Sequence, residues 1–99
     1  MRFLVTWKVS EDKWVDIVDV YSSMSAEERG DVGDGVSLVG RWHDLADKSG
    51  VAILESEDIS AVFAYLGRWN AHMETTVRPV LEDEDAAEVG KLIVSAARS

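Results

Sequence analysis

The sequence predicts one α+β domain, in which two helices cover one face of a four-stranded antiparallel sheet and a further helix follows at the C-terminus. Three observations predict this fold. Four short segments are rich in β-branched and aromatic residues, and two longer segments between them repeat apolar residues every three or four positions. These segments follow one another as β-α-β-β-α-β, and two right-handed β-α-β crossovers place both helices on the same side of the sheet.

The first strand and the first helix lie in the N-terminal third of the chain. Residues 2–8 predict a strand that carries apolar side chains on both faces. Ser10 is a candidate N-cap for the helix that follows. The apolar stripe of this helix consists of Trp14, Ile17, Val18 and Tyr21. Residues 25–28 match a capping box and predict a kink or a separate short turn, before a loop at residues 31–35.

The second and third strands and the second helix come next. Residues 36–43 and 51–56 predict two strands, whose polar connection is too long for a two-residue hairpin turn. The two strands pair most simply as an antiparallel hairpin. Asp58 is expected to cap the second helix. The buried stripe of that helix consists of Ile59, Val62, Phe63, Leu66 and Trp69.

The C-terminal quarter predicts a fourth strand and a last helix. The strand is expected at residues 74–81, and it should lie at an edge of the sheet because Pro79 has no backbone N–H to donate. Four carboxylates at residues 82–85 favour the N-terminal turn of the last helix. The thin apolar stripe of this helix consists of Val89, Leu92, Ile93 and Ala96.

The composition indicates a single acidic domain over residues 1–99. Ten Lys and Arg against 19 Asp and Glu give a net charge of −9, so neither nucleic acid nor an anionic membrane is an expected partner. The chain has no cysteine, which excludes disulfides and thiolate metal sites. With no signal-peptide pattern and no apolar run of about 20 residues, the expected location is the cytoplasm.

The uncovered face of the sheet predicts a homodimer. Two helices on one side leave alternate residues of four apolar strands on the other side without cover. Monomeric proteins rarely expose an apolar patch of that size. We therefore expect two copies of the chain to pack sheet against sheet around a two-fold axis.

Several blocks of the sequence also resemble a known family. They are VTW at residues 5–7, GRWHD at residues 40–44 and RPVLED at residues 78–83, together with Glu55 and Trp69. The chain resembles a bacterial family of domains of unknown function, which is similar to the dimeric α+β barrel proteins with a ferredoxin-like protomer. That group includes cofactor-free monooxygenases, muconolactone-type isomerases and stress-responsive barrel proteins. The resemblance implies a ferredoxin-like fold and a dimer, and it supplies no catalytic residues.

The segment from Val36 to Asp44 carries the main candidates for chemistry. His43 titrates near neutral pH when unperturbed and is the candidate acid or base, and Arg41 shares its strand face if the pleat is regular. Glu55, at the end of the paired strand, would join them if the register allows. Two interpretations stay open: an anion-orienting arginine beside a proton-transferring histidine, or an Arg41–Glu55 cross-strand ion pair with His43 at a sheet edge.

Four tryptophans provide further candidates. Trp14 and Trp69 lie on helical stripes and are expected to pack in the core. Trp7 and Trp42 lie near strand ends, where either could form a wall of an apolar pocket for a flat ligand. Arg78 is expected to pair with an acid across the dimer or to reach the same pocket as Arg41.

Metals and cofactors have little support in the sequence. His72 is expected to be solvated, and no HxxxH or HExxH pattern occurs. No phosphate-binding glycine loop and no nucleophile motif is present, so neither a metal nor a cofactor is expected. We expect a protein that binds a small apolar or anionic metabolite. The alternative is a cofactor-independent monooxygenase- or isomerase-like enzyme that uses His43 and Arg41.

Overall fold

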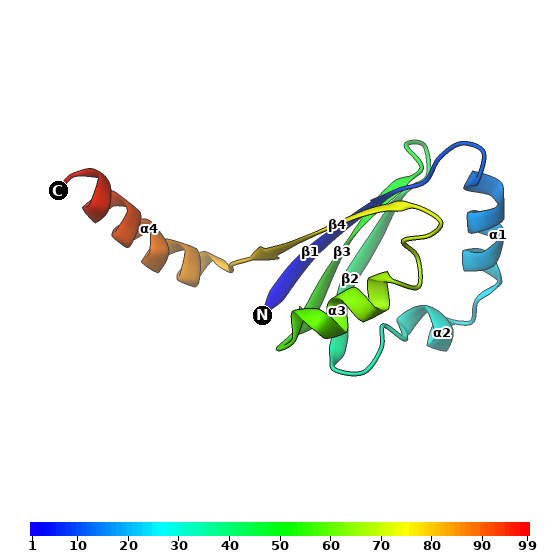
Figure 1. The fold of residues 1–99 in the computed structure, drawn as a ribbon, viewed down its shortest axis with the longest axis horizontal. Coiled ribbons are helices and arrows are strands. Elements are labelled where there is room, and N and C mark those ends of the chain that lie inside the picture. Colours follow the sequence, from blue (N-terminus) through cyan, green and yellow to red (C-terminus); the bar gives the residue numbers. More distant parts are fainter.

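The computed structural model describes residues 1–99 and contains one four-stranded antiparallel sheet with four helices (Figure 1). The elements are β1 (Arg2–Lys8), α1 (Trp14–Ser23), α2 (Ala26–Gly30), β2 (Val36–Asp44), β3 (Ser49–Ser56), α3 (Ile59–Leu66), β4 (Glu74–Val80) and α4 (Asp83–Ala97). The predicted α+β class and order of elements are therefore confirmed. No helix has both the length and the apolar character that crossing a bilayer requires.

The strands lie in the order β2-β3-β1-β4, and every neighbouring pair is antiparallel. β1 and β3 form the centre of the sheet, as expected for strands with apolar residues on both faces. β4 lies at one edge, which confirms the expectation from Pro79. The register runs across the whole sheet, because Thr6 of β1 faces Thr76 on one side and Val51 on the other.

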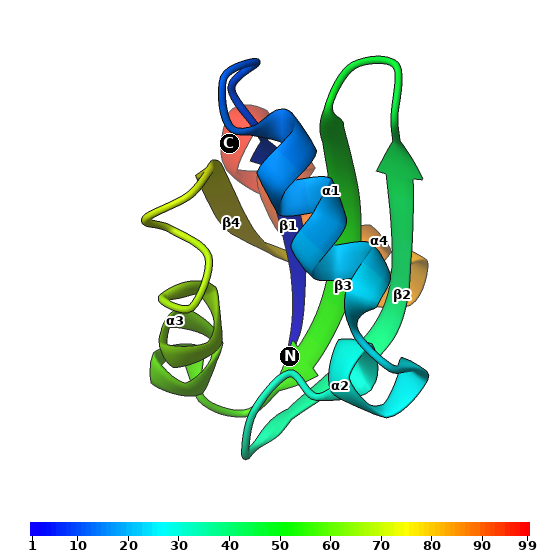
Figure 2. The ribbon, with the colours of Figure 1, turned by 90° about the vertical axis from the view of Figure 1, so that its right-hand side faces the viewer.

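α1 and α3 lie on the same face of the sheet (Figure 2). The two helices differ in how closely they pack against the sheet. α3 packs closely, and its Val62 and Leu66 join the apolar core. The core cluster consists of Phe3, Val5, Val32, Ala52, Leu54, Val62 and Leu66. α1 has no fully buried residue, and its Trp14, Ile17 and Tyr21 are only half-buried because a pocket lies between most of its apolar stripe and the sheet.

The helix ends test the capping predictions. Ser25 accepts a hydrogen bond from the backbone N–H of Glu28 while the Glu28 side chain accepts one from the backbone N–H of Ser25, so the capping box is confirmed. Asp58 caps α3 as expected, by accepting from the N–H of Ser60. The prediction for Ser10 is wrong: α1 begins at Trp14, after a turn in which the N–H of Lys13 donates to the Ser10 carbonyl.

The second face of the sheet has no cover from its own chain. This open face carries Leu4, Val51, Ile53 and Val80, all half-buried, and Trp42, whose side chain is 60% exposed. The terminal helix α4 does not lie over it. In Figure 1, α4 continues beyond the end of β4 and points away from the rest of the chain. The sheet therefore has one face with helices and one face without them, on which several apolar side chains have no cover.

Candidate functional site

A β-bulge in β2 determines which side chains face the helices. Leu38 pairs with Leu54 and Gly40 pairs with Ile53, so Val39 is an extra residue in the strand. Leu54 belongs to the core, and Leu38 therefore lies on the helix side of the sheet. The bulge shifts the alternation by one residue beyond this point. As a result Arg41 and His43, opposite Ala52 and Gly50, also lie on the helix side.

Gly50 of β3 brings an indole and an imidazole together. It pairs with Trp7 of β1 on one side and with His43 of β2 on the other. A Cβ at position 50 would collide with the indole of Trp7, so this close approach requires glycine. The rings of Trp7 and His43 consequently meet across β3, with centroids 5.3 Å apart in an edge-to-face arrangement.

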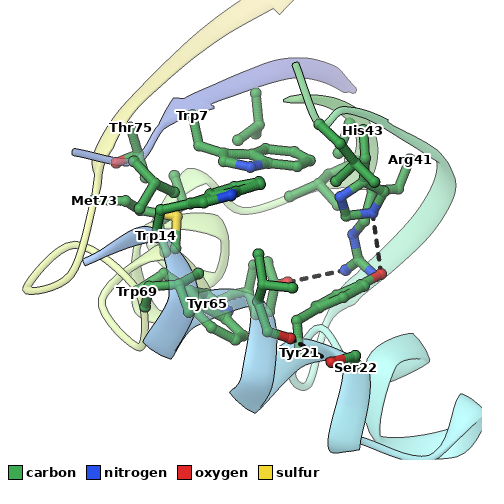
Figure 3. Close-up of a pocket in the computed structure, with 18 residues that line it drawn as sticks. Trp7, Trp14, Tyr21, Ser22, Arg41, His43, Tyr65, Trp69, Met73 and Thr75 are labelled. Carbon is green, nitrogen blue, oxygen red and sulfur yellow. Dashed lines mark hydrogen bonds between the residues drawn. The ribbon is translucent and has the colours of Figure 1, made fainter. Parts of the chain in front are cut away.

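The space beneath α1 is a pocket of about 360 Å³ between the sheet, α1 and the end of α3 (Figure 3). Hydrophobic residues make up 14 of the 18 that line it, so its interior favours an apolar molecule. Trp14 and Met73 lie at one end of the pocket, Arg41, His43 and Tyr21 lie at the other, and the indole of Trp7 lies between them, next to His43 (Figure 3). The remaining residues of the lining are Val5, Val9, Ile17, Val18, Ser22, Leu45, Ala52, Leu54, Tyr65, Leu66, Trp69 and Thr75.

Arg41 is held at the polar end of the pocket by neutral groups only. Its Nη1 donates to the backbone carbonyl of Arg29 at 2.9 Å and to the hydroxyl of Tyr21 at 3.2 Å, and its Nη2 donates to the hydroxyl of Tyr65 at 3.0 Å. The guanidinium is half-buried, and it takes part in none of the ion pairs of the chain. The pocket therefore contains a fixed positive charge without a counter-ion.

His43 lies beside this cation and is biased towards its neutral form. Partial burial is the main cause that lowers the pKa of its imidazole below 6.5, and the charge of Arg41 lowers that pKa further. Nε2 of His43 is 3.2 Å from the hydroxyl oxygen of Tyr21. When His43 is neutral with its hydrogen on Nδ1, Tyr21 can accept from Arg41 and donate to His43 at the same time. The three side chains then form one hydrogen-bonded chain.

The structure separates the other candidate residues from this pocket. Glu55 and Trp42 lie on the open face, opposite Ser37 and Val51 respectively. Glu55 forms its ion pairs with Arg2 and the amino group of Met1, so the Arg41–Glu55 pair considered from the sequence does not form. Arg78 is also on the open face, where it pairs in register with Leu4. Of the ligand-binding candidates, only Trp7 reaches the pocket.

Trp14 and Trp69 line the pocket instead of filling the core. Both are half-buried. Trp14 remains at the pocket wall because α1 stands off the sheet, and Trp69 lies in the turn beyond Leu66, where α3 ends earlier than its apolar stripe suggested. His72 lies in the same turn and is exposed. No three His, Asp or Glu side chains converge on a metal-sized site.

Tyr21 and Tyr65 are functional candidates that the sequence analysis did not single out. Their hydroxyls hold Arg41 from two different helices. Tyr21 ends the apolar stripe of α1, and Tyr65 lies three residues after Val62, on the inner side of α3. A tyrosine on an inward stripe brings a hydroxyl that needs a partner. The need of each hydroxyl for a hydrogen-bond partner was the signal in the sequence that could have identified both tyrosines.

Comparison with known proteins adds a family and no activity. No curated protein and no solved structure matched the chain. A family model described as a domain of unknown function, DUF3303, matches residues 1–93, which is nearly the whole chain. The match covers the complete sheet, both helices over it, and the pocket between them. The chain therefore belongs to the DUF3303 family.

Proposed function

We propose that the pocket binds a small molecule with a flat apolar body and an anionic head group. The observation that carries this proposal is the unpaired guanidinium of Arg41, half-buried among neutral acceptors. A cation withdrawn from water without a counter-ion is unfavourable, and an anionic ligand would compensate for it. The planar fork of arginine matches a carboxylate in geometry, which makes a carboxylate the preferred head group.

The rest of the pocket supports an apolar body. Trp14 provides an indole surface away from Arg41, Trp7 provides a second one beside His43, and the volume of about 360 Å³ lies at the lower end of the range for small-molecule sites. No residue in the apolar stripe of α1 is fully buried. A bound ligand would fill the space below α1 and remove both apolar surfaces from water.

A matched pair of ligands tests the proposal. The assay is the quenching of tryptophan fluorescence, checked by calorimetry, with 2-naphthoate and its uncharged counterpart 2-naphthamide as probes. We expect the carboxylate to bind at least tenfold more tightly than the amide, because a charge-assisted hydrogen bond contributes about 1.5–3 kcal/mol. Arg41→Gln should remove this preference. Arg98→Gln, at the exposed end of α4, is the matched control and should keep it.

Two results would reject a carboxylate site. One is equal affinity for the acid and the amide in the unchanged protein. The other is a preference for the acid that survives Arg41→Gln, since the charge would then act from elsewhere. If both probes bind weakly but the carboxylate is still preferred, the anion site is supported. The weak affinity would then mean that naphthalene does not match the shape of the apolar part of the pocket.

We also propose that the protein is a homodimer of the dimeric α+β barrel type. The strand order supports a ferredoxin-like protomer, because from the other edge it is β4-β1-β3-β2, with both crossover helices on one face. The uncovered face supports the dimer, because Trp42, Val51 and Ile53 leave an apolar surface in water. Light scattering after size-exclusion chromatography should give twice the chain mass at micromolar concentration, and a single-chain mass would reject the dimer.

The second candidate is a cofactor-independent enzyme, and the observation that favours it is the state of His43. A neutral imidazole can accept a proton, and here it lies beside a guanidinium that would stabilise negative charge on the substrate. The test is exchange of acidic C–H hydrogens in bound carboxylates, followed by proton NMR in heavy water. Exchange that depends on His43 would support catalysis, whereas binding without exchange would support a binding protein.

A further inference from the structure

The terminal helix α4 has no packing partner in its own chain. It is 15 residues long and buries none of them. Val89, Leu92 and Ile93 of its apolar stripe are 42%, 70% and 63% exposed. A lone helix of this length is marginal in water, and most helices in proteins depend on packing of an apolar face. This helix therefore needs a surface that the chain itself does not give it in this conformation.

The open face of the sheet, in turn, lacks a helix or strand that covers its apolar side chains. Its most exposed apolar group is Trp42 of β2, which pairs in register with Val51 and lies over Gly40 of its own strand. The neighbouring pair is Gly40 and Ile53. A 15-residue helix is about 22 Å long and about 10 Å wide, so it matches the length of one strand pair and the width of two strands. One helix can cover the β2–β3 half of this face.

The position of α4 indicates that it covers the open face of a second copy of the chain instead of its own. α4 leaves the sheet after Val80, which pairs with Arg2 at the β4 edge. Trp42 lies on the opposite edge strand and at the opposite end of the sheet, in the row that contains Val51 and Thr6. The two are at diagonal corners, and α4 points away from its own sheet in Figure 1. In a twofold dimer, α4 of each chain could cover the open face of the other, so the exposed helix and the exposed sheet face of both chains would be buried.

The open face and α4 carry charged groups of opposite sign that have no partner in their own chain. Arg78 of β4 is exposed on the open face and takes part in none of the ion pairs of the chain. The first turn of α4 carries Asp83, Glu84 and Asp85, which are also without a cationic partner. These acids follow directly after β4. If two β1–β4 halves meet at the twofold axis, the acids of one chain approach Arg78 of the other.

We propose that two copies of the chain exchange their C-terminal helices. The β1–β4 halves of the two open faces meet at the axis, and α4 of each chain lies over the β2–β3 half of the other, with its stripe against Trp42, Val51 and Ile53. This inference rests on the homodimer proposed above and adds the segment that completes its interface. The occupant of the open face is thus a second copy of the same helix and sheet.

Engineered cysteines test the exchange directly, because the natural chain has none. Two variants, Val51→Cys on the open face and Leu92→Cys on α4, are co-expressed with different tags and treated with a flexible bis-maleimide. The expected product joins one chain of each variant. Leu92→Cys combined with Val15→Cys is the matched control, since Val15 is 75% exposed on α1 and away from the open face. That pair should give no comparable product.

The double variant Val51→Cys/Leu92→Cys, treated at high dilution, separates exchange from folding back. A product within one chain as the main species would overturn the proposal, because α4 would then cover its own sheet. A dimer that gives no link between positions 51 and 92 would overturn the exchange and keep the homodimer. A single-chain mass for the unmodified protein would reject both proposals together.

Charge substitutions on the stripe give an independent measurement. Leu92→Asp and Ile93→Asp should each weaken dimerisation at least tenfold in analytical ultracentrifugation, while circular dichroism of the separated chain stays unchanged. Val15→Asp, which places the same charge on an exposed apolar site of α1, should leave the dimer intact. A dimer of unchanged strength in both α4 variants would overturn the proposed role of this helix.

Discussion

The indole of Trp7 meets the imidazole of His43 edge to face across β3, with ring centroids 5.3 Å apart. The two residues lie on strands that are not neighbours, and only Gly50 separates them. Any side chain at that position would occupy the space of the Trp7 ring. The floor of the pocket therefore depends on one missing side chain, and the rings on either side connect its apolar end to its polar end.

Replacing this glycine should disturb both the fold and the pocket. Gly50→Ala forces the indole of Trp7 away from β3 and into the pocket, and such overpacking costs about 1–3 kcal/mol. We expect a lower free energy of unfolding in urea, a shifted tryptophan emission maximum and weaker binding of naphthoate. Gly30→Ala is the control, because a Cβ there meets nothing within 4 Å. Equal stability of the two variants would show that Trp7 has room to move.

The two tyrosines that hold Arg41 should act as one unit. Tyr65→Phe and Tyr21→Phe each remove an acceptor from the guanidinium, at a cost of about 1 kcal/mol of unfolding free energy. A double-mutant cycle by chemical denaturation should show coupling between them, since they share a partner although they lie on different helices. Strictly additive losses would mean that Arg41 compensates for each loss separately.

The titration of His43 should appear below its usual range. Burial and the charge of Arg41 both lower the pKa of the folded imidazole beneath the unfolded value of about 6.5. The unfolded chain then binds this proton more readily. The contribution of His43 to stability is therefore complete above pH 6.5 and is lost as the pH falls through the folded pKa. NMR titration of the imidazole protons, with His43→Gln to assign them, measures this pKa, and a value at or above 6.5 would contradict the burial.

Much of the fold could be predicted from local sequence. The strand positions, the edge position of β4 and the caps at Ser25 and Asp58 all depend on residues within a few positions of one another. The shared face of Arg41 and His43 followed from alternation along one strand. The presence of both side chains beneath the helices depends on the bulge at Val39. The adjacent Gly40, an isolated glycine inside a strand pattern, was the local signal for a bulge, and the prediction did not use it.

The set of residues that line the pocket was harder to predict than the strand that carries Arg41 and His43. Glu55 was a candidate because it ends the strand paired with that of His43, and Trp42 because it lies near a strand end. The cross-strand register turns both to the open face. Trp14 was expected in the core because its helical stripe is apolar. Periodicity indicates which side of a helix faces inward, but it does not give the distance between helix and sheet, and that distance makes Trp14 a pocket wall.

Binding of an anionic ligand should depend on pH through His43. A carboxylate held by Arg41 would lie close to the imidazole, and its negative charge favours the protonated form, so binding raises the pKa of His43 from its lowered value. Affinity for 2-naphthoate should then increase as the pH falls from 8 towards 6, by at most tenfold per pH unit, and become constant below the pKa of the unbound protein. Calorimetry in two buffers with different ionisation enthalpies would detect the proton that is taken up.

The uncharged probe and one substitution isolate the source of that dependence. Protonation of His43 brings no attraction to 2-naphthamide, so its affinity should stay constant or decrease as the pH falls. His43→Gln keeps a polar group of similar size but cannot titrate, and the pH dependence for naphthoate should disappear while the preference for the acid over the amide remains with Arg41. A dependence that persists in His43→Gln would place the titrating group elsewhere, and the anion would then not lie between these two side chains.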